Sequence, residues 1–249
     1  MTDWSIPNKE QHMTKLGIIG AMDLEVDALK EKLTDVTVTT KATMDFYEGK
    51  LCGTDAVVVR CGIGKVNAAL CVQILCDLFA VTHIINTGVA GSLNPSLNIG
   101  DILISTDAIH HDLDITIFGY APGQVPGQDA RNFIADSMLA DLALHLCREV
   151  NPDIRAIKGR VVSGDQFISS SEIKDRLIAE FEADCTEMEG ASIAHGATLN
   201  GIPFVIIRAI SDKADGSAEM DYPTFERQAA QHSAKLVEAI CESIHAKAF

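Results

Sequence analysis

The sequence lacks the marks of a disulfide-stapled secreted domain. Its seven cysteines are odd in number, form no CxxC pair and lie mostly in apolar stretches. We therefore expect reduced core cysteines and a reducing compartment. Residues 1–14 are polar and contain no apolar signal core, and no segment has the length and apolarity of a transmembrane helix. The sequence thus predicts a cytoplasmic protein whose residues 1–14 form a poorly ordered extension without an assigned function.

Positive charge is also scarce. Lys and Arg number 20 against 35 Asp and Glu, which gives a net charge of -15. A surface with this field repels phosphate backbones and anionic headgroups, so nucleic acid and membranes are disfavoured as partners. The basic residues are scattered and form no cluster for a highly phosphorylated substrate. A neutral small molecule fits this charge balance better.

The chain contains no linker, internal repeat or low-complexity tract. A chain of 249 residues, 47% of them hydrophobic, can bury roughly 75% of its unfolded surface, so residues 15–249 are expected to form one domain. Two domains are possible but are not needed. Apolar runs of strand length alternate with helical patterns, which predicts an α/β layered domain. The runs are Leu16–Met22, Ala56–Cys61, His83–Thr87, Ile102–Ser105, Arg160–Ser163 and Phe204–Ile210.

Two segments, 36–50 and 160–163, lack evident crossover helices before the next strand, which favours antiparallel pieces in a twisted mixed sheet. Another segment, 112–131, breaks the α/β pattern with several Gly and Pro residues. A loop this long in a compact domain is usually functional, either as a lid or as an interface.

Carboxylates follow two of these predicted strands and one further strand-like segment. Glu25 lies in the first turn of a helix, where it either forms a solvated N-terminal turn or faces the crevice at the carboxyl end of a strand. Glu187 and Glu189 lie at the start of another predicted helix, where two carboxylates exceed what helix capping requires. Asp212 ends a nearly continuous apolar strand, so its pKa should be raised, as a general acid near neutrality requires.

Other motifs favour less specific interpretations. Residues 62–66 (GIGKV) lack the spacing of a phosphate-binding loop and indicate a tight strand-to-helix turn. Residues 87–91 (TGVAG) are small enough for backbone amides to approach a flat ligand. His110, His111, Asp112 and Asp114 could ligate a metal, but neighbours on an extended segment point to opposite faces, so no metal site is predicted.

Six motifs occur in order from about Lys15 to the C-terminus. They are Gly17–Met22 with Glu25, Gly62–Val66, Asn86–Gly91, Ser163–Ile168, Glu187–Glu189 and Arg208–Asp212. Together they resemble the bacterial 5'-methylthioadenosine/S-adenosylhomocysteine nucleosidases of the nucleoside phosphorylase superfamily. The resemblance implies a nucleoside phosphorylase-like three-layer α/β/α sandwich around a twisted mixed β-sheet. It also implies a homodimer without metal or organic cofactor.

The implied reaction is hydrolysis of the N-glycosidic bond of these two nucleosides, and of 5'-deoxyadenosine, with release of adenine and the 5-thioribose product. Such a reaction serves methionine salvage and the recycling of S-adenosylmethionine by-products. Asp212, held by Ser211, matches the acid that protonates adenine N7. Glu25 matches the residue that activates water, with Arg208 orienting it.

The resemblance also assigns the substrate contacts. Glu189 matches the residue that grips the ribose hydroxyls, with Met188 beneath the sugar. The adenine slot matches Phe167 and Ile168. Further substrate-binding positions are Glu187, Val89, Ala90 and Gly91. The 5' substituent matches Ile63, Ile115 and Phe225, and a second subunit is expected to contribute Phe118, Tyr120 and Pro126.

Val89 departs from the family pattern, which often has Ser there, and this leaves the hydrogen-bond network of Asp212 and the substrate range open. One rival function is a phosphorylase, but Asp23 and Glu25 stand where phosphate would need Arg. Another is a nucleoside-binding protein without turnover, which the joint presence of Glu25, Glu189 and Asp212 disfavours. Futalosine or another 5'-modified adenosine also stays open as the substrate.

Overall fold

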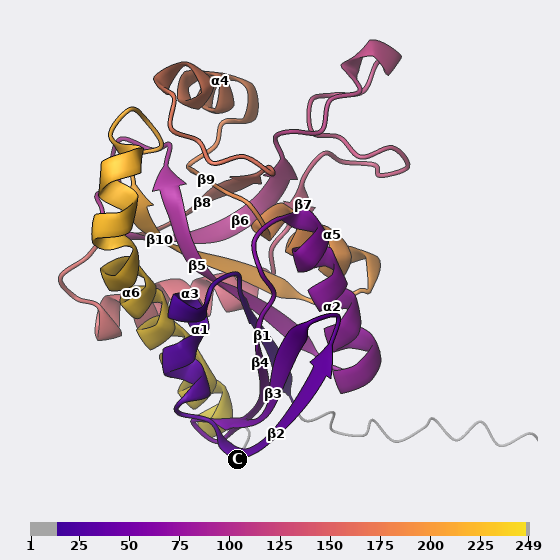
Figure 1. Ribbon diagram of the computed structural model, residues 1–249, viewed down its shortest axis with the longest axis vertical. Helices are drawn as coiled ribbons and strands as arrows, with labels where there is room; N and C mark the ends of the chain where they lie inside the picture. The colour runs from indigo at the N-terminus through magenta and orange to yellow at the C-terminus, as the bar shows by residue number, and fades with distance from the viewer. Residues whose placement is uncertain (1–13, 248–249) are drawn as a thin grey trace, which may run out of the picture.

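The computed structural model describes residues 14–247. The predicted N-terminal extension, residues 1–14, lies outside the described residues except for Thr14. Helices cover both sides of a central twisted sheet (Figure 1). The helices are α1 (Asp23–Lys30), α2 (Lys65–Phe79), α3 (Ser137–Val150), α4 (Ser171–Phe181), α5 (Gly190–Leu199) and α6 (Ala218–Lys247), with a short 3-10 turn, η1 (Thr116–Phe118).

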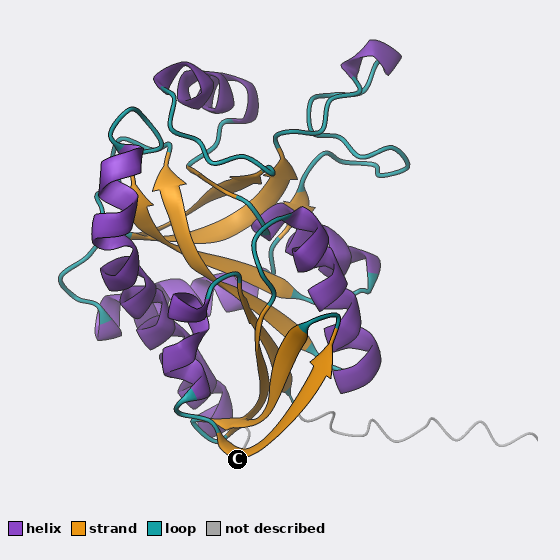
Figure 2. Cartoon of the chain, in the orientation of Figure 1, coloured by secondary structure: helices purple, strands orange, loops and turns teal. Residues whose placement is uncertain are grey.

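All strands of the described residues join a single sheet, drawn in orange in Figure 2. They are β1 (Lys15–Gly20), β2 (Thr34–Lys41), β3 (Met44–Leu51), β4 (Thr54–Arg60), β5 (His83–Ser92), β6 (Ile102–His110), β7 (Phe133–Ile134), β8 (Ala156–Ser163), β9 (Cys185–Glu187) and β10 (Phe204–Asp212). The order is β10-β6-β8-β9-β5-β1-β4-β3-β2, with β7 on β6. Since β10 also pairs with β5, the strands β5, β9, β8, β6 and β10 close into a ring.

The pairing directions confirm one expectation about antiparallel pieces and correct the other. Segment 36–50 forms the antiparallel pair β2 and β3, as expected. Segment 160–163 belongs to β8, which is parallel to both β6 and β9, so that part of the prediction is wrong. The physical reason is that α3 precedes β8 and α4 follows it, and such crossover helices return the chain for parallel pairing. The antiparallel pairs in this region are β10 with β6 and β5 with β9.

The core consists of two large apolar layers, one on each face of the sheet, and a smaller apolar cluster that includes Leu177 and Phe181 of α4. Successive residues of a strand point to opposite faces, so Ile18 and Ile19 of β1 enter different layers. Ile19 packs in the layer that holds Leu75 of α2 and Ala194 of α5. Ile18 packs in the layer that holds Leu29 of α1 and residues of α3 and α6. This arrangement confirms the predicted three-layer α/β/α sandwich around a mixed sheet.

The state of the cysteines and the length and apolarity of the helices can be compared with what the sequence predicts. All seven cysteines are free, and those of the core are Cys61, Cys71, Cys147, Cys185 and Cys241. Within residues 14–247, no helix is long and apolar enough to cross a bilayer.

The topology also determines where a ligand can bind. Strands β1, β4, β5 and β10 run parallel to one another across the centre of the sheet. Their carboxyl ends therefore meet at one edge, where α/β sheets bind ligands. Glu25 follows β1, residues 89–91 lie near the end of β5, and Asp212 ends β10.

Replacing Phe46 by Ala tests the packing of the β3 side of the sheet. Phe46 is fully buried and stacks on Phe79 with ring centroids 5.1 Å apart. The expected loss of unfolding free energy is about 3–5 kcal/mol, because the truncation leaves a cavity in the core. Urea unfolding at fixed protein concentration measures it. The control Val38→Ala, at a side chain 50% exposed on β2, should change stability by no more than about 0.5 kcal/mol. Equal losses in the two variants would contradict the packing argument.

Candidate active site

A cavity of about 350 Å³ opens at the carboxyl edge of the sheet. Its size falls within the range of small-molecule sites. Glu25 and Asp212, the predicted base and acid, both line this cavity. The full lining is Ala21, Met22, Glu25, Ile63, Val89, Ala90, Gly91, Phe167, Thr186, Glu187, Met188, Glu189, Ser211, Asp212 and Tyr222.

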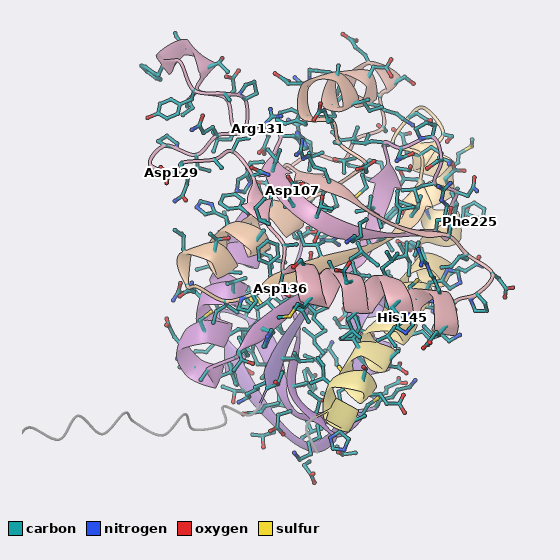
Figure 3. The ribbon with its side chains drawn as sticks, turned by 180° about the vertical axis from the view of Figure 1, so that it is seen from behind. Asp107, Asp129, Arg131, Asp136, His145 and Phe225 are labelled. Atoms are coloured by element: carbon teal, nitrogen blue, oxygen red, sulfur yellow. The ribbon has the colours of Figure 1, made fainter. Side chains whose placement is uncertain are left out.

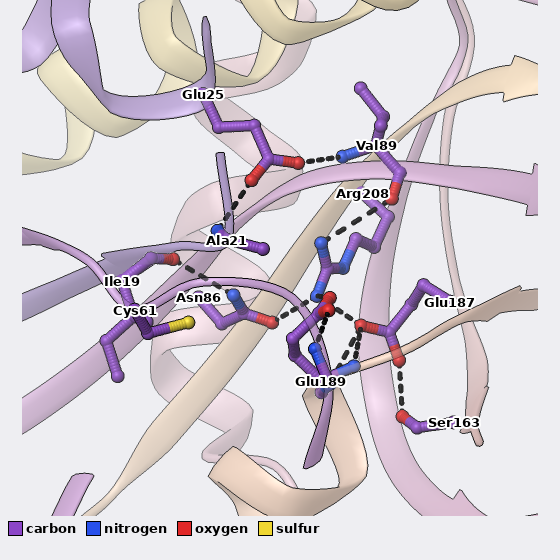
Figure 4. A network of polar contacts seen from close by, with 12 residues as sticks. Ile19, Ala21, Glu25, Cys61, Asn86, Val89, Ser163, Glu187, Glu189 and Arg208 are labelled. Atoms are coloured by element: carbon purple, nitrogen blue, oxygen red, sulfur yellow. Dashed lines mark hydrogen bonds and ion pairs between the residues drawn. The ribbon is translucent and has the colours of Figure 1, made fainter. Parts of the chain in front are cut away.

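Glu25 is held by backbone amides from the turn between β1 and α1 and from strand β5 (Figure 4). One carboxylate oxygen accepts from the amides of Ala21 at 2.7 Å and Met22 at 3.0 Å, and the other accepts from the amide of Val89 at 3.1 Å. The side chain is buried, which excludes the alternative of a solvated helix turn. Burial raises the pKa of Glu25 above its usual range, although Arg208 and the three amides act to lower it.

Asp212 owes its orientation to an irregularity at the end of β10. The pairing of β10 with β5 shifts register between Ile210 and Asp212, which lets the neighbours Ser211 and Asp212 face the same cavity. The Ser211 hydroxyl and the Ala214 amide each donate to one carboxylate oxygen of Asp212, both at 2.8 Å. Burial raises the pKa of Asp212 against these two donors, which confirms the direction expected from the apolar strand.

Arg208 lies at the centre of the buried polar network in Figure 4. Its guanidinium donates to Glu187 in a very short contact, donates to the Asn86 side-chain oxygen at 2.6 Å, and lies 3.7 Å from a Glu189 oxygen. Asn86 is held in turn by the carbonyl of Ile19, 2.9 Å away. Sequence reasoning assigned Arg208 and both glutamates to the site, but the supporting role of Asn86 was not predicted.

The Glu187 carboxylate connects other protein groups, so it is not free to bind a ligand. Besides Arg208, it accepts from the amides of Glu189 at 3.1 Å and Gly190 at 2.8 Å, and the Ser163 hydroxyl donates to its other oxygen. Because these donors occupy its oxygens, Glu187 fixes the start of α5 and so the position of Glu189.

The site carries an excess of negative charge. Glu25, Glu187 and Glu189 surround the single guanidinium of Arg208, and all four side chains are buried. Burial and the neighbouring Glu187 raise the pKa of Glu189 to about 7, although Arg208 and the Gly64 amide act to lower it. Such a cluster favours a ligand that develops positive charge, because like charges in a buried site repel one another.

Two glycines of β5 make room for these side chains. Gly88 pairs in register with Arg208, and a Cβ there would lie 2.2 Å from the guanidinium and 2.5 Å from Glu25. A Cβ at Gly91 would lie 2.7 Å from an Asp212 oxygen. The small residues of segment 87–91 therefore admit the charged side chains as well as any flat ligand.

An aromatic pair stands at the cavity wall. The rings of Phe167 and Tyr222 meet edge to face with centroids 5.6 Å apart, and the Tyr222 hydroxyl donates to the Met22 sulfur at 3.2 Å. Ile168 lines a smaller hollow that shares Phe167 and Asp212 with the main cavity. Phe167 and Ile168, the two residues predicted for the adenine slot, therefore line the same hollow as the predicted acid, Asp212.

The structure does not bring Phe225 to the cavity. Tyr222, one turn earlier on α6, lines it instead, and Phe225 lies at the edge of the molecule in Figure 3. Both residues are aromatic and three apart, so they lie near one face of the helix and sequence spacing does not separate them. Which of them reaches the cavity depends on where α6 begins relative to β10.

The long loop between β6 and β7 projects away from the sheet (Figure 1). None of its predicted site residues lines the cavity of the same chain; they are Ile115, Phe118, Tyr120 and Pro126. The Phe118 side chain is 77% exposed. Ile115 was expected within the chain's own site, whereas the other three were expected to serve a second subunit.

Two of the residues considered as metal ligands, His110 and Asp112, have other contacts. The His110 ring packs edge-on against Phe133 and His195, at centroid distances of 5.9 and 5.7 Å. Asp112 forms an ion pair with Lys65. Within the part of the chain that the structure describes, no group of three or more His, Cys, Asp or Glu is arranged to hold a metal ion.

Comparisons with known proteins place this site in a family. The model of the phosphorylase superfamily matches residues 15–242. A protein of Halalkalibacterium halodurans named 5'-methylthioadenosine/S-adenosylhomocysteine nucleosidase is 45% identical over 92% of this chain and 98% of its own length. The chain belongs to this nucleosidase family of the phosphorylase superfamily. The family predicted from the sequence is thus confirmed.

Solved structures of the nucleosidase family share the fold. The nucleosidase of Neisseria meningitidis, in complex with methylthio-immucillin-A, has a TM-score of 0.89 and 39% identity, covering 92% of this chain and 99% of that chain. The nucleosidase of Colwellia psychrerythraea, in complex with adenine, has the same TM-score and identity over 94% and 96%. A futalosine hydrolase of Helicobacter pylori has a TM-score of 0.88 and 33% identity over 94% and 100%.

The raised pKa of Glu189 predicts a pH-dependent contribution to stability. Its pKa of about 7 exceeds the ordinary 4.5, so the native state retains this proton over a range in which the unfolded chain has released it. The contribution is full below pH 4.5 and is lost as pH rises to about 7. Glu189→Gln mimics the protonated form, so its melting temperature relative to the parent nucleosidase should rise across this window. A constant difference between pH 4.5 and 7.5, measured by calorimetry, would contradict the raised pKa.

Proposed function

We propose that this nucleosidase hydrolyses the N-glycosidic bond of 5'-methylthioadenosine and S-adenosylhomocysteine, releasing adenine and the 5-thioribose product. The observation that carries the proposal is that Glu25 and Asp212, two carboxyl groups with raised pKa, face one cavity. The reaction serves methionine salvage and the recycling of S-adenosylmethionine by-products.

Asp212 is the general acid of the proposed reaction. Adenine is a poor anionic leaving group, so the bond breaks readily when N7 gains a proton as the bond stretches. The raised pKa keeps Asp212 protonated to higher pH than an exposed aspartic acid. Ser211 and the Ala214 amide fix the carboxyl group in place. Val89 supplies no hydroxyl to this network, and Ser211 supplies one.

Glu25 is the base that activates water. Its three amide donors fix the carboxylate, and one of them is the backbone amide of Val89, which is independent of the side chain at that position. As the bond to adenine breaks, positive charge grows on the sugar. The carboxylates of Glu25 and Glu189 stabilise this charge more in the transition state than in the neutral substrate.

Glu189 grips the ribose hydroxyls, with Met188 beside the sugar and Phe167 and Ile168 around the base. The wall of Ile63, Met22 and Tyr222 suits an apolar 5' substituent. Such a pocket distinguishes substituents that differ by one methylene by only about 1–3 kcal/mol. We therefore include 5'-deoxyadenosine among the substrates.

Phosphorolysis fits the site less well than hydrolysis. Phosphate needs free cationic and hydroxyl donors. The Arg208 guanidinium is instead engaged by Glu187, Glu189 and Asn86, and Glu25 adds negative charge beside it. Water is therefore the nucleophile, and adenine release proceeds without phosphate.

The proposed enzyme is a cytoplasmic homodimer. Its seven free cysteines fit a reducing compartment. Large apolar side chains are exposed on both sides of the proposed contact: Ile63 on the cavity wall and Val66 at the start of α2, and Ile117 and Phe118 on the long loop. Large exposed apolar patches mark interaction surfaces. A second copy covers them and inserts Phe118, Tyr120 and Pro126 over the 5' substituent.

Asp212→Asn tests the acid. It should lower kcat by at least about 10²–10⁴-fold while substrate still binds, because the amide cannot donate the catalytic proton. Adenine release is followed with each of the three nucleosides in phosphate-free buffer, and binding is followed by calorimetry. Asp141→Asn, at an aspartate of α3 paired with Lys158, is the control and should turn over normally. Unchanged kcat in Asp212→Asn would remove this residue from the mechanism, and no adenine from any nucleoside would refute the function.

Phe118→Ala tests the second subunit's contribution. Loss of a buried phenylalanine contact costs about 1.5–3 kcal/mol, so KM for methylthioadenosine should rise roughly tenfold or more. Met138→Ala, at an equally exposed apolar residue of α3, is the control and should leave KM unchanged. Light scattering of both variants reports the oligomeric state. A monomeric wild-type protein with full activity would refute the shared site.

A further inference from the structure

Two loops bring substrate-binding groups to the cavity. The first, residues 61–65, joins β4 to α2 and carries Ile63 on the cavity wall. Its Gly64 amide donates to Glu189 at 2.8 Å. The second, residues 164–168, follows β8 and carries Phe167 and Ile168. The two loops are about 100 residues apart in the sequence, so their relative position must be fixed by tertiary contacts.

Lys65, Asp112 and Asp165 connect these two loops. The Lys65 ammonium group donates to one Asp112 oxygen at 2.5 Å, and the Asp165 amide donates to the other at 3.0 Å. The Lys65 amide in turn donates to the Asp165 side chain at 2.9 Å. Asp112, at the start of the long loop, thus holds both binding loops with its two oxygens. We name Lys65, Asp112 and Asp165 the loop clasp.

The clasp is partly shielded from solvent. The side chains of Lys65 and Asp112 are 21% and 17% exposed. Burial acts to raise the pKa of Asp112, but the hydrogen bonds from Lys65 and the Asp165 amide outweigh it and hold that pKa below its usual range. Asp112 is therefore ionised wherever the protein is folded near neutrality.

The backbone on both sides of the clasp has little freedom to adjust. Gly64 has φ of +98°, a conformation that other residues rarely adopt, and a Cβ there would lie 3.0 Å from an Asp165 oxygen. A Cβ at Gly164 would lie 2.4 Å from the His111 ring. The loops are thus packed closely on the elements that carry the clasp, and a change in the clasp moves the cavity wall.

We propose that Lys65 and Asp112 are positioning residues that hold the Gly64 amide on Glu189 and the Phe167 loop over the base. Neither residue lines the cavity. The proposal rests on the function proposed above, in which Glu189 grips the ribose and Phe167 the adenine. The clasp couples these two contacts, since one carboxylate carries both loops.

Lys65→Met removes the ammonium group and keeps the aliphatic stem. We expect kcat/KM for methylthioadenosine to fall about 10- to 100-fold, because small displacements of binding groups have effects of this size. The loss should depend on the ribose hydroxyls. Removing the 3'-hydroxyl from the substrate should therefore lower kcat/KM by a smaller factor in Lys65→Met than in the wild type. Equal factors in both proteins would overturn the proposal.

The pH dependence of kcat/KM is a second readout, and a general loss of stability would not shift it. The Gly64 amide acts to lower the pKa of Glu189. Losing this contact should shift the acidic limb of kcat/KM to higher pH in Lys65→Met, while Lys65→Arg, which keeps the charge, should restore the wild-type limb. An unshifted limb in Lys65→Met would overturn the proposal.

The control pair is Lys15 and Glu48, which form an ion pair at the same distance of 2.5 Å with Lys15 23% exposed. Lys15 lies at the start of β1, opposite the carboxyl edge. Lys15→Met should keep kcat/KM within about twofold of wild type. If Lys15→Met matched the loss in Lys65→Met, the effect would be one of general stability and the proposal would fail.

Adenine binding separates this proposal from the function. Asp112→Ala removes both acceptors of the clasp, so its Kd for adenine, measured by calorimetry, should rise about tenfold over that of wild type. This measurement does not depend on turnover. An unchanged Kd for adenine would overturn the clasp, whereas failure of the wild type to release adenine would refute only the proposed function.

Discussion

The structure depends on one buried guanidinium, that of Arg208 on β10, the strand that pairs with both β5 and β6. A charge without solvent access is tolerated only if it is paired and hydrogen-bonded. Glu187 and Asn86 bond directly to it, and Glu189 lies within ion-pair distance. Each partner comes from a different element: β9, β5 and the start of α5. Pairing this one charge therefore brings together segments that are far apart in the sequence.

This pairing leaves more carboxylates than cations in the site. Burial raises the pKa of Glu25, and burial together with the neighbouring Glu187 raises that of Glu189, so holding these groups ionised costs stability in the free enzyme. The same excess suits a reaction whose transition state carries positive charge on the sugar. Stability and proposed function thus make opposite demands on the same side chains, as is common in active sites.

The site is held largely by backbone amides. Those of Ala21, Met22 and Val89 orient Glu25, that of Gly64 orients Glu189, and that of Ala214 orients Asp212. Backbone donors are fixed by the strands and turns that carry them. The carboxylates are consequently arranged before any ligand arrives, whereas the aromatic side chains Phe167 and Tyr222 stand at the cavity wall and contact each other edge to face.

The sequence by itself determined the strand and helix alternation, because hydrophobic periodicity is a local property of the chain. It also indicated carboxylates at the ends of three strands and the family, since Glu25, Glu189 and Asp212 stand within recognisable motifs. Their roles remain predictions. Tertiary structure alone decided that β8 pairs in parallel, because α4 was not evident from its polar composition. It also decided that Tyr222, not Phe225, reaches the cavity, because the start of α6 depends on packing. The loop clasp was equally invisible, since Lys65, Asp112 and Asp165 meet only when three separate loops fold onto one edge of the sheet.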